Sequence, residues 1–236
     1  MGVAYGSSTI YQATKGIVQD GLVLNLDAGV KESYNGGTTW RDLKGSNNGT
    51  LTNGPTFSSA NGGSIGFDGS NQYIDLGSSA PVTSKLAGSD SVSCCFWYKR
   101  YTSESNSGII GIGSSLNRQI WVYNTASYGV QLSVDNTSSV QTGVKENSVQ
   151  SIGAWFHYSL TWTAGSAKIY RNGTLVNTDS NPTGTICSAQ STNYLGYIAG
   201  FGYNEIDLGQ VIIYNKVLSA NEVAQNFNVM RYRFGI

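Results

Sequence analysis

Residues 206–223 read IDLGQVIIYNKVLSANEV, an apolar strand pattern that passes directly into a short helical pattern. Ser219 and Glu222 have the S-x-x-E spacing of a capping box, in which each side chain satisfies a backbone N–H group of the first helical turn. Leu218 and Val223 stand at the two positions of a hydrophobic staple. The stretch therefore predicts a strand that is followed at once by a capped helix.

The predicted helix carries one apolar stripe, because Val223, Phe227 and Met230 follow each other at i, i+4 and i+7. Such a stripe needs a surface to pack on. Almost everything earlier in the chain is typical of β-structure, with short alternating segments between clusters of Gly, Asn and Ser. The sequence thus predicts an all-β domain closed by a single helix. The candidate strands lie near residues 22–27, 64–68, 72–76, 91–100, 119–124, 128–135, 155–163, 167–171, 174–177 and 206–214.

Several of these segments resemble the laminin-G-like, concanavalin-A-like jelly-roll domains. IIYNKVLSANEVAQNF at 212–227 is similar to the closing strand and helix of that family. VSCCFWYKR at 92–100 resembles its F-x-W-x-K strand, and WFHYSLTWTAGSAKIYRNGTLV at 155–176 resembles its W-x-H hairpin. LVLNLDAG at 22–29 and IGFDGSNQYIDLG at 65–77 extend the same resemblance.

The resemblance implies a fold class: an antiparallel jelly-roll β-sandwich with one short C-terminal helix. It places this domain at residues 21–230 and leaves an N-terminal arm at 1–20 and a C-terminal tail at 231–236. Apolar residues in the arm, such as Ile17 and Val18, give it something to bury. An arm that adds a strand to this domain or to a neighbour and a disordered leader both remain open.

Charge narrows the range of partners. Charged residues make up 12% of the chain, and its 14 basic residues balance its 14 acidic ones. No net field or block of like charge attracts nucleic acid or an anionic membrane. No apolar run approaches the roughly 18 residues that cross a bilayer, and the start shows no export signal. We therefore expect neither a nucleic-acid partner nor a membrane partner.

The three cysteines do not form an evident disulfide framework. Cys94 and Cys95 are neighbours in a predicted strand, where adjacent side chains point to opposite faces. No C-x-x-C metal spacing occurs. We predict that Cys94, Cys95 and Cys187 are free thiols, consistent with assembly in a reducing cytoplasm.

One motif raises the question of catalysis. EIDLGQ at 205–210 approaches the E-x-D-x-E or E-x-D-x-x-E strand motif of retaining β-glucanases on this fold, which need two carboxyl groups about 5 to 5.5 Å apart. Here Gly209 or Gln210 stands where the general acid belongs, and neither side chain can cycle a proton. We interpret Glu205 and Asp207 as residues of the strand that leads into the helix, so the protein is expected not to be an enzyme.

The remaining candidates for catalysis and metal binding are isolated. His157 is the only histidine, and the family commonly has a structural strand histidine there, so we predict a hydrogen-bonded framework residue. Asp68, Asp75 and Asp135 are candidate calcium ligands at loops or strand ends, but no D-x-D-x-D loop gathers them. The sequence predicts no cofactor and leaves calcium open.

The best binding candidate comes from strand parity. If 119–124 and 128–133 form a hairpin, one face carries the apolar residues and the other carries aromatics, amides and hydroxyls. Aromatic rings cover the C–H side of a sugar ring while amides bond its hydroxyls, so this second face is a candidate glycan platform. The alternative is that a loop, another subunit or the second sheet covers it. The candidate glycan-binding residues are Gln119, Trp121, Tyr123, Gln131 and Ser133.

A finer resemblance suggests where the protein works. TTWRDLKGSNNGTLTNGPTFSSANGGSIGFDG at 38–69 and NFNVMRYRFGI at 226–236 resemble laminin-G-like proteins of tailed bacteriophages, notably those infecting cyanobacteria. The resemblance implies a non-enzymatic virion structural or decoration module on the capsid, neck or fibre, assembled in the host cytoplasm. Its expected partners are other virion proteins and host-surface polysaccharide, and homo-oligomerisation stays open. The alternatives are a degenerate or active β-glycan hydrolase and a cellular lectin or adhesion module.

Overall fold

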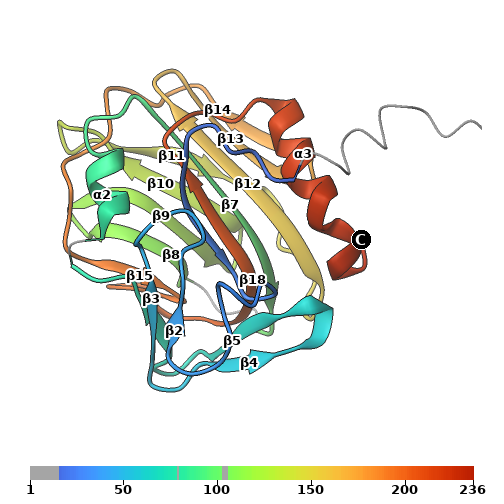
Figure 1. Ribbon diagram of the computed structural model, residues 1–236. Helices are drawn as coiled ribbons and strands as arrows, with labels where there is room; N and C mark the ends of the chain where they lie inside the picture. Colours follow the sequence, from blue (N-terminus) through green and yellow to red (C-terminus); the bar gives the residue numbers. More distant parts are fainter. Residues whose placement is uncertain (1–15, 79, 103–105) are drawn as a thin grey trace, which may run out of the picture.

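Two antiparallel β-sheets lie face to face in the computed structural model, which describes residues 16–78, 80–102 and 106–236 (Figure 1). In sheet A, two strands share one edge of β18, because its first half pairs with β5 and its second half pairs with β1. The strands of sheet A, in spatial order, are β14 (Thr174–Asp179), β13 (Ser166–Arg171), β12 (Trp155–Thr163), β7 (Ser91–Arg100), β18 (Glu205–Tyr214), β5 (Ser64–Asp68) and β4 (Thr56–Ser58), with β1 (Leu22–Asp27) beside β18.

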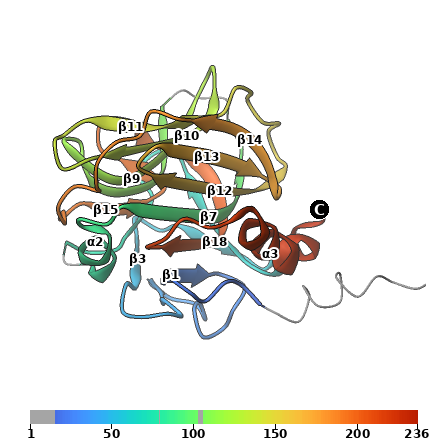
Figure 2. The same ribbon diagram turned by 90° about the horizontal axis from the view of Figure 1, so that it is seen from above.

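Sheet B forms the other layer of the sandwich (Figure 2). A separate short hairpin, β16 (Tyr197–Ile198) and β17 (Gly202–Tyr203), and helix α2 (Pro81–Leu86) accompany the two sheets. The strands of sheet B, in spatial order, are β11 (Gln141–Lys145), β10 (Gly129–Asp135), β9 (Asn117–Thr125), β8 (Ser107–Ser114), β15 (Asn193–Leu195), β6 (Tyr73–Asp75), β3 (Gly49–Thr52) and β2 (Thr39–Trp40).

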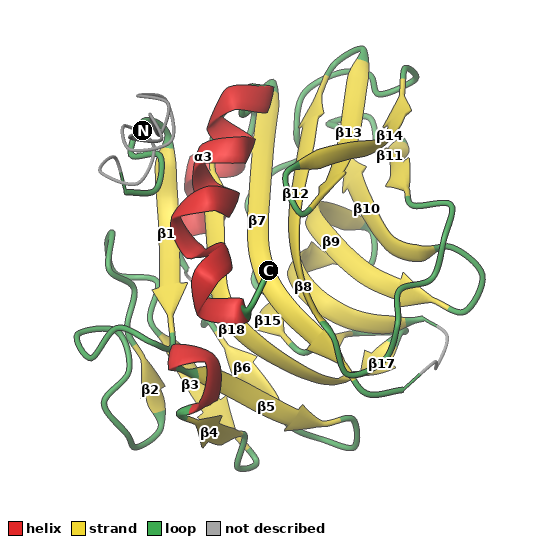
Figure 3. Ribbon diagram, turned by 90° about the vertical axis from the view of Figure 1, so that its right-hand side faces the viewer, coloured by secondary structure: helices red, strands yellow, loops and turns green. Residues whose placement is uncertain are grey.

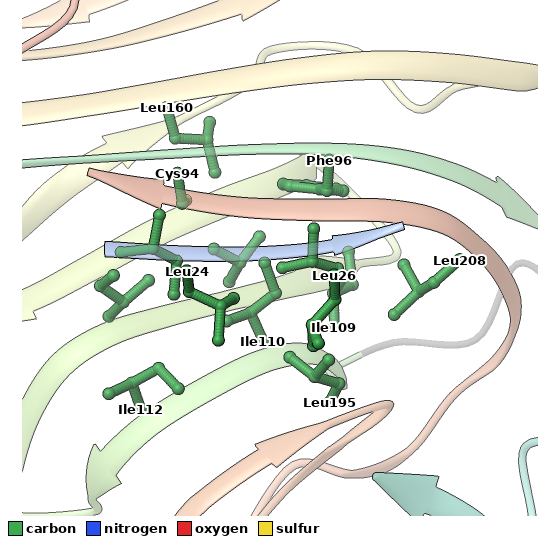
Figure 4. Close-up of a cluster of buried hydrophobic side chains, with 14 of the residues drawn as sticks. Leu24, Leu26, Cys94, Phe96, Ile109, Ile110, Ile112, Leu160, Leu195 and Leu208 are labelled. Atoms are coloured by element: carbon green, nitrogen blue, oxygen red, sulfur yellow. The ribbon is translucent and has the colours of Figure 1, made fainter. Parts of the chain in front are cut away.

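The core fills the space between the sheets. Leu24 and Leu26 of β1 and Phe96 of β7 face Ile110 and Ile112 of β8, as Figure 4 shows, and all five are at most 1% exposed. A fully buried side chain of this size stabilises the fold by about 1.5–3 kcal/mol relative to exposure. This arrangement confirms the predicted antiparallel sandwich. Within the described residues, no helix is long and apolar enough to cross a membrane.

Helix α3 (Ala220–Met230) confirms the predicted capped helix. The hydroxyl of Ser219 accepts from the backbone N–H of Glu222 at 3.3 Å, and the Glu222 carboxylate accepts from the backbone N–H of Ser219 at 2.8 Å. The helix lies across the outer face of sheet A (Figure 3), where Phe227 stacks on Trp97 of β7 at 5.8 Å between ring centroids. The apolar stripe thus packs on the outside of the sandwich rather than in its interior.

Both terminal segments contribute more to the domain than the sequence suggested. Residues 1–15 of the expected arm lie outside the described residues. Val18, however, is buried, and its backbone N–H donates to Asn226 of α3 at 2.9 Å. The expected tail at 231–236 is corrected: it forms the 3-10 turn η2 (Arg231–Phe234), whose Phe234 is 4% exposed, because the aromatic side chains of β7 and β12 give it an apolar surface to cover.

Candidate functional site

The predicted hairpin in sheet B forms with the expected register. Tyr123 of β9 lies opposite Gln131 of β10, and Trp121 lies opposite Ser133. The intervening residues of both strands, Ile120, Val122, Val130 and Leu132, point into the core. Trp121, Tyr123, Gln131 and Ser133 therefore point away from the core, on the outer face of the sheet.

A second hairpin covers part of that outer face. The β16–β17 hairpin lies over β8 at two glycines, where a Cβ on Gly108 would be 2.4 Å from the backbone nitrogen of Ile198 and one on Gly111 would be 2.9 Å from its Cγ1. The turn of the hairpin carries Phe201, whose ring centroid lies 5.6 Å from that of Trp121 and 4.5 Å from that of Tyr123. The hairpin is thus a lid on the aromatic part of the face.

The expectation that Trp121 offers an open ring is wrong. Trp121 is 3% exposed, since Ile198 and Phe201 cover it and the Arg118 guanidinium lies 4.8 Å from its ring centroid. Its indole N–H donates to the carbonyl of Gly113 at 3.0 Å. A loop covers this face, as the alternative interpretation allowed.

Gln119 is also unavailable to a ligand. It is completely buried, and its amide nitrogen donates to the carbonyls of Thr83 at 2.9 Å and Cys187 at 3.2 Å. These bonds tie β9 to helix α2 and to the loop before β15. Gln119 is therefore a framework residue.

The other three candidates, Tyr123, Gln131 and Ser133, come together at the floor of two hollows, where Gln131 is partly exposed while Tyr123 is 8% and Ser133 is 4% exposed. Two open hollows of about 310 and 390 Å³ share Tyr123 and Gln131 as lining residues, and we call them the paired hollows. The first extends along β10 and β11 to the loop after β14, and the second extends to the turn of the β9–β10 hairpin. Their further polar and aromatic lining includes Ser133, Gln141, Asn181, Ser127, Tyr128 and Phe201.

Hydrogen bonds hold the floor of the paired hollows and leave acceptors free. The amide nitrogen of Gln141 donates to the Ser133 hydroxyl at 2.9 Å, and that hydroxyl also lies 3.2 Å from the phenol oxygen of Tyr123. The amide nitrogen of Gln131 points to Thr125 at 3.4 Å. In the part of the chain that the structure describes, the amide oxygens of Gln131 and Gln141 accept no hydrogen bond. Both acceptors are therefore unused within the described protein.

Residues of the EIDLGQ motif at 205–210 line a separate and smaller hollow on sheet A. Its volume is about 220 Å³, and its lining includes Glu205, Asp207 and a further carboxylate, Asp68, which is the strand partner of Glu205. The Asp207 carboxylate is 2.8 Å from the ammonium of Lys99 and accepts from the Tyr101 hydroxyl at 2.7 Å. Asp207 is therefore held in place by two neighbours.

The motif positions that should supply a general acid serve the framework. Gly209 packs beneath Phe234, where an added Cβ would lie 2.5 Å from the ring. Gln210 is buried and its amide donates to Asn25 at 3.2 Å. The structure adds Asp68 as a neighbouring carboxylate that spacing alone did not identify, because it comes from another strand.

The family described as the Concanavalin A-like lectin/glucanases superfamily, a laminin-G-type family, matches residues 68–224. The chain belongs to this family. Domain 4 of AbnA, a GH43 extracellular arabinanase from Geobacillus stearothermophilus solved with arabinotriose, is similar to this concanavalin A-like chain with a TM-score of 0.68 and 18% identity. That similarity covers 89% of this chain and 99% of the domain. No curated protein matches the chain.

Two larger proteins share the concanavalin A-like fold. Trypanosoma rangeli sialidase has a TM-score of 0.65 at 12% identity, covering 92% of this chain and 34% of the sialidase, so the chain spans about a third of that protein. A structure of botulinum neurotoxin type C, whose cell entry is described as dependent on interaction with two ganglioside molecules, has a TM-score of 0.63 at 16% identity. The similarity covers 89% of this chain and 51% of the neurotoxin chain. These similarities show the fold.

His157 is a framework residue of the concanavalin A-like domain, but its side chain lacks the expected hydrogen bond. It is 1% exposed and packs between Trp97, at 5.0 Å, and Phe227, at 5.8 Å between ring centroids. Among the described residues its Nδ1 atom has no partner. Burial lowers the pKa of His157 from 6.5 to about 3, so the imidazole is neutral at physiological pH.

The three candidate calcium ligands do not meet. Asp68 caps a turn by accepting from the backbone N–H of Ser70, Asp75 does the same for Gly77, and Asp135 pairs with Arg118 at 3.1 Å. Across 16–78, 80–102 and 106–236, no three His, Cys, Asp or Glu side chains are grouped for a metal ion. Calcium binding through these residues has no assembled site there.

The cysteines are free, as predicted. Cys94, Cys95 and Cys187 are all buried and unbridged. Burial raises the pKa of Cys95 and of Cys187 to about 11, which keeps both in the thiol form. None of the three is placed as a nucleophile, because the thiolate is the reactive form.

Proposed function

We propose that this protein is a non-enzymatic glycan-binding module, carried on the virion of a tailed bacteriophage as a structural or decoration protein. The observation that carries the glycan proposal is the pair of hollows that share Tyr123 and Gln131. They combine aromatic rings with amide and hydroxyl groups on a rigid sheet. This is the chemistry that orients a neutral sugar, since rings cover C–H groups and fixed polar groups bond hydroxyls.

Charge at the paired hollows supports a neutral ligand. One hollow is lined by Lys145 and Asp179, which have opposite charges. The Lys145 ammonium lies 3.6 Å from the ring centroid of Tyr128 and is thus engaged by an aromatic face. A polyanion would find no cluster of basic residues among these lining residues.

Two of the solved structures are consistent with this proposal. The arabinanase domain was solved with arabinotriose, and the neurotoxin is described as interacting with two ganglioside molecules, so both of those proteins meet a carbohydrate. Their identities to this chain, 18% and 16%, are low. They raise the expectation of a carbohydrate ligand without naming one.

The absence of enzymatic activity is part of the proposal. Two carboxylates with distinct acid and nucleophile roles are needed for glycoside hydrolysis with retention. Here Asp207 is ion-paired with Lys99, and the final motif positions hold Gly209 and Gln210. Asp68 beside Glu205 is the one neighbour that makes a direct test of hydrolysis worthwhile.

The virion role rests on the sequence resemblance at 38–69 and 226–236. We propose other virion proteins as partners and the virion as the location. The segment proposed for attachment is the N-terminal arm at 1–20, and residues 1–15 are the part to delete, because Val18 is bonded to α3. Deleting them should leave a folded domain that no longer joins the particle, and full incorporation of the shortened protein would contradict this part of the proposal.

Glycan binding is tested on an array that contains neutral oligosaccharides, including arabinotriose, together with purified host-surface polysaccharide. Gln131→Ala and Gln141→Ala should each weaken binding, because each removes an amide at the paired hollows. Gln225→Ala is the matched control, since Gln225 lies on α3 at the outer face of the opposite sheet. No binding by the unaltered protein, or equal binding by all four proteins, would overturn the proposal.

A further inference from the structure

Four tyrosines gather on the outer face of sheet B, two of them on the β16–β17 hairpin and two on the neighbouring strands β6 and β15. The rings of Tyr197 and Tyr203 stack with centroids 4.5 Å apart, and Tyr73 meets Tyr194 edge-on at 5.2 Å. The two pairs contact each other through Tyr194 and Tyr197, whose ring centroids are 5.6 Å apart. We call these four residues the tyrosine cluster. Its members come from four different strands and are brought together only by the fold.

The tyrosine cluster is accessible and its hydroxyl groups are free. All four side chains are partly exposed. Elsewhere in the domain, buried tyrosines such as Tyr158 and Tyr214 use their hydroxyls in hydrogen bonds to the protein. Within the described residues, none of the four cluster hydroxyls does so. The cluster therefore presents ring surface and unpaired phenol groups together.

The neighbours of the tyrosine cluster on the same face are polar. Register places Thr52 of β3 opposite Tyr73, and Asp75 of β6 lies between Thr50 and Tyr194 on adjacent strands. Protein interfaces have an apolar, desolvated centre. Hydroxyl and carboxylate groups around tyrosine rings suit a ligand rich in hydroxyls better than an apolar protein surface.

The tyrosine cluster and the paired hollows lie on the same face of sheet B, and the row of residues between them is covered by the β16–β17 hairpin. Tyr194 is opposite Gly111, Gly111 is opposite Trp121, and Trp121 is opposite Ser133, so one row of side-chain positions crosses β15, β8, β9 and β10. Three inter-strand spacings amount to roughly 14 Å. That span is longer than a single sugar ring.

The β16–β17 hairpin supplies rings to both regions. Phe201 in its turn contacts Tyr123 at the paired hollows, whereas Tyr197 and Tyr203 belong to the tyrosine cluster. A ligand that touches both regions must therefore lie across the hairpin. Because the rings are already packed against one another, little conformational freedom is lost when they bind.

We propose that the tyrosine cluster is a second carbohydrate contact, and that the ligand of this face is an extended neutral polysaccharide lying across the β16–β17 hairpin. This inference rests on the proposed glycan-binding function. It adds the class of ligand, a chain of several sugar rings rather than a terminal sugar. Affinity should consequently rise with chain length until the ligand spans both regions.

The test uses full-length protein and titrates a length series. The probes are the disaccharide, tetrasaccharide and octasaccharide of the linear glycan that binds best among arabinan, cellulose and laminarin fragments. Tyr203→Ala and Tyr73→Ala should each weaken octasaccharide binding by about five- to tenfold, the loss expected for one aromatic contact. Both should bind the disaccharide as the unaltered protein does. Tyr232→Ala, at a tyrosine that is 73% exposed on the C-terminal turn, is the control and should change neither.

The outcomes separate this inference from the proposed function. If the unaltered protein binds no member of the series and no host polysaccharide, both fail together. If it binds, and the Gln141→Ala variant weakens all lengths while Tyr203→Ala and Tyr73→Ala bind the octasaccharide unchanged, the proposed function stands and the tyrosine cluster is not a ligand contact. If an alanine variant unfolds, Tyr203→Phe tests the same contact. It keeps the aromatic ring, so it should retain the part of the octasaccharide affinity that comes from stacking. A change of oligomeric state without a change in glycan binding would assign the cluster to a protein partner and overturn the proposal.

Discussion

The ring of Phe234 lies flat on the indole of Trp97, with centroids 4.2 Å apart and ring planes 13° apart. The ring centroid of Trp155 lies 4.7 Å from that of the same phenyl ring, which also occupies the place where a side chain at Gly209 would stand. Arg233 fixes the turn from the other side, since its guanidinium is 2.6 Å from Asp27. The last residues of the chain therefore close a small apolar cluster on the outer face of sheet A.

Phe234→Ala should lower the free energy of unfolding by about 3 to 5 kcal/mol, because it leaves a cavity over two tryptophans. Urea denaturation monitored by tryptophan fluorescence measures the change. Tyr232→Ala, two residues earlier and largely exposed, should have little effect. Equal stability of the two variants would show that the C-terminal turn is not part of the cooperative fold.

The two ends of helix α3 should differ in their contribution to stability. Ser219→Ala removes the cap and should cost about 1 kcal/mol, whereas Phe227→Ala should cost about 3 to 5 kcal/mol through a cavity against Trp97. Thermal unfolding of both variants in one buffer gives the order directly. A Phe227→Ala melting temperature equal to that of the unaltered protein would contradict the packing described for the helix.

Trp121→Ala should destabilise the protein by about 3 to 5 kcal/mol, because the indole is covered by the β16–β17 hairpin. Gln141→Ala, at an exposed position of β11, should leave stability within about 0.5 kcal/mol. Chemical denaturation compares the two. If Trp121→Ala kept full stability and lost only glycan binding, the hairpin would have to open in solution and expose the ring.

Stability should fall in mild acid because of His157. Its folded-state pKa of about 3 lies below the ordinary 6.5, so the unfolded chain binds the extra proton first as pH decreases. The stabilisation from the neutral imidazole is complete above pH 6.5 and is lost progressively toward pH 3, by up to about 4 to 5 kcal/mol. His157→Phe should flatten the difference in unfolding free energy between pH 7 and pH 5, and an unchanged slope would contradict the burial of the imidazole.

Incubation with β-glucans should release no reducing ends. The position of a general acid holds Gly209 or Gln210, and proton donation by such a group contributes about 10²- to 10⁴-fold in rate. A reducing-sugar assay with the unaltered protein and with Glu205→Gln checks this expectation. Turnover that disappears in Glu205→Gln would identify Glu205 as a catalytic residue and contradict the proposal that the protein is not an enzyme.

Local sequence patterns predicted the parts of the fold that depend on neighbouring residues. The Ser219 and Glu222 spacing gave the capped helix, and alternation at 119–133 gave the register of the β9–β10 hairpin. Such patterns could not predict that the outer face of sheet B is partly covered, because Phe201, which covers Trp121, lies 80 positions further along the chain. The segment at 197–203 does not alternate between apolar and polar residues. Its glycines permit the tight turn of the hairpin but give no sign of strands in the sequence.

The tail was misjudged for a related reason. Phe234 is isolated in sequence from any apolar run, so only the three-dimensional position of Trp97 shows that it is buried. At the candidate site, Tyr123, Gln131 and Ser133 were predicted from the alternation of the strands. Gln141 was missed because it lies on β11, a strand that the sequence did not predict, and Phe201 because it comes from a distant hairpin.

The β16–β17 hairpin packs directly on the backbone of β8 at Gly108 and Gly111, which have no side chains. A single methyl group at either position would raise the hairpin, and Phe201 and Tyr203 would move with it because they share that short element. The distance between the paired hollows and the tyrosine cluster thus depends on β8, although the glycines of β8 lie beneath the hairpin and cannot contact a ligand. A substitution at Gly108 or Gly111 during evolution would therefore alter the paired hollows and the tyrosine cluster at the same time. Substitutions of the aromatic residues themselves can instead occur one at a time.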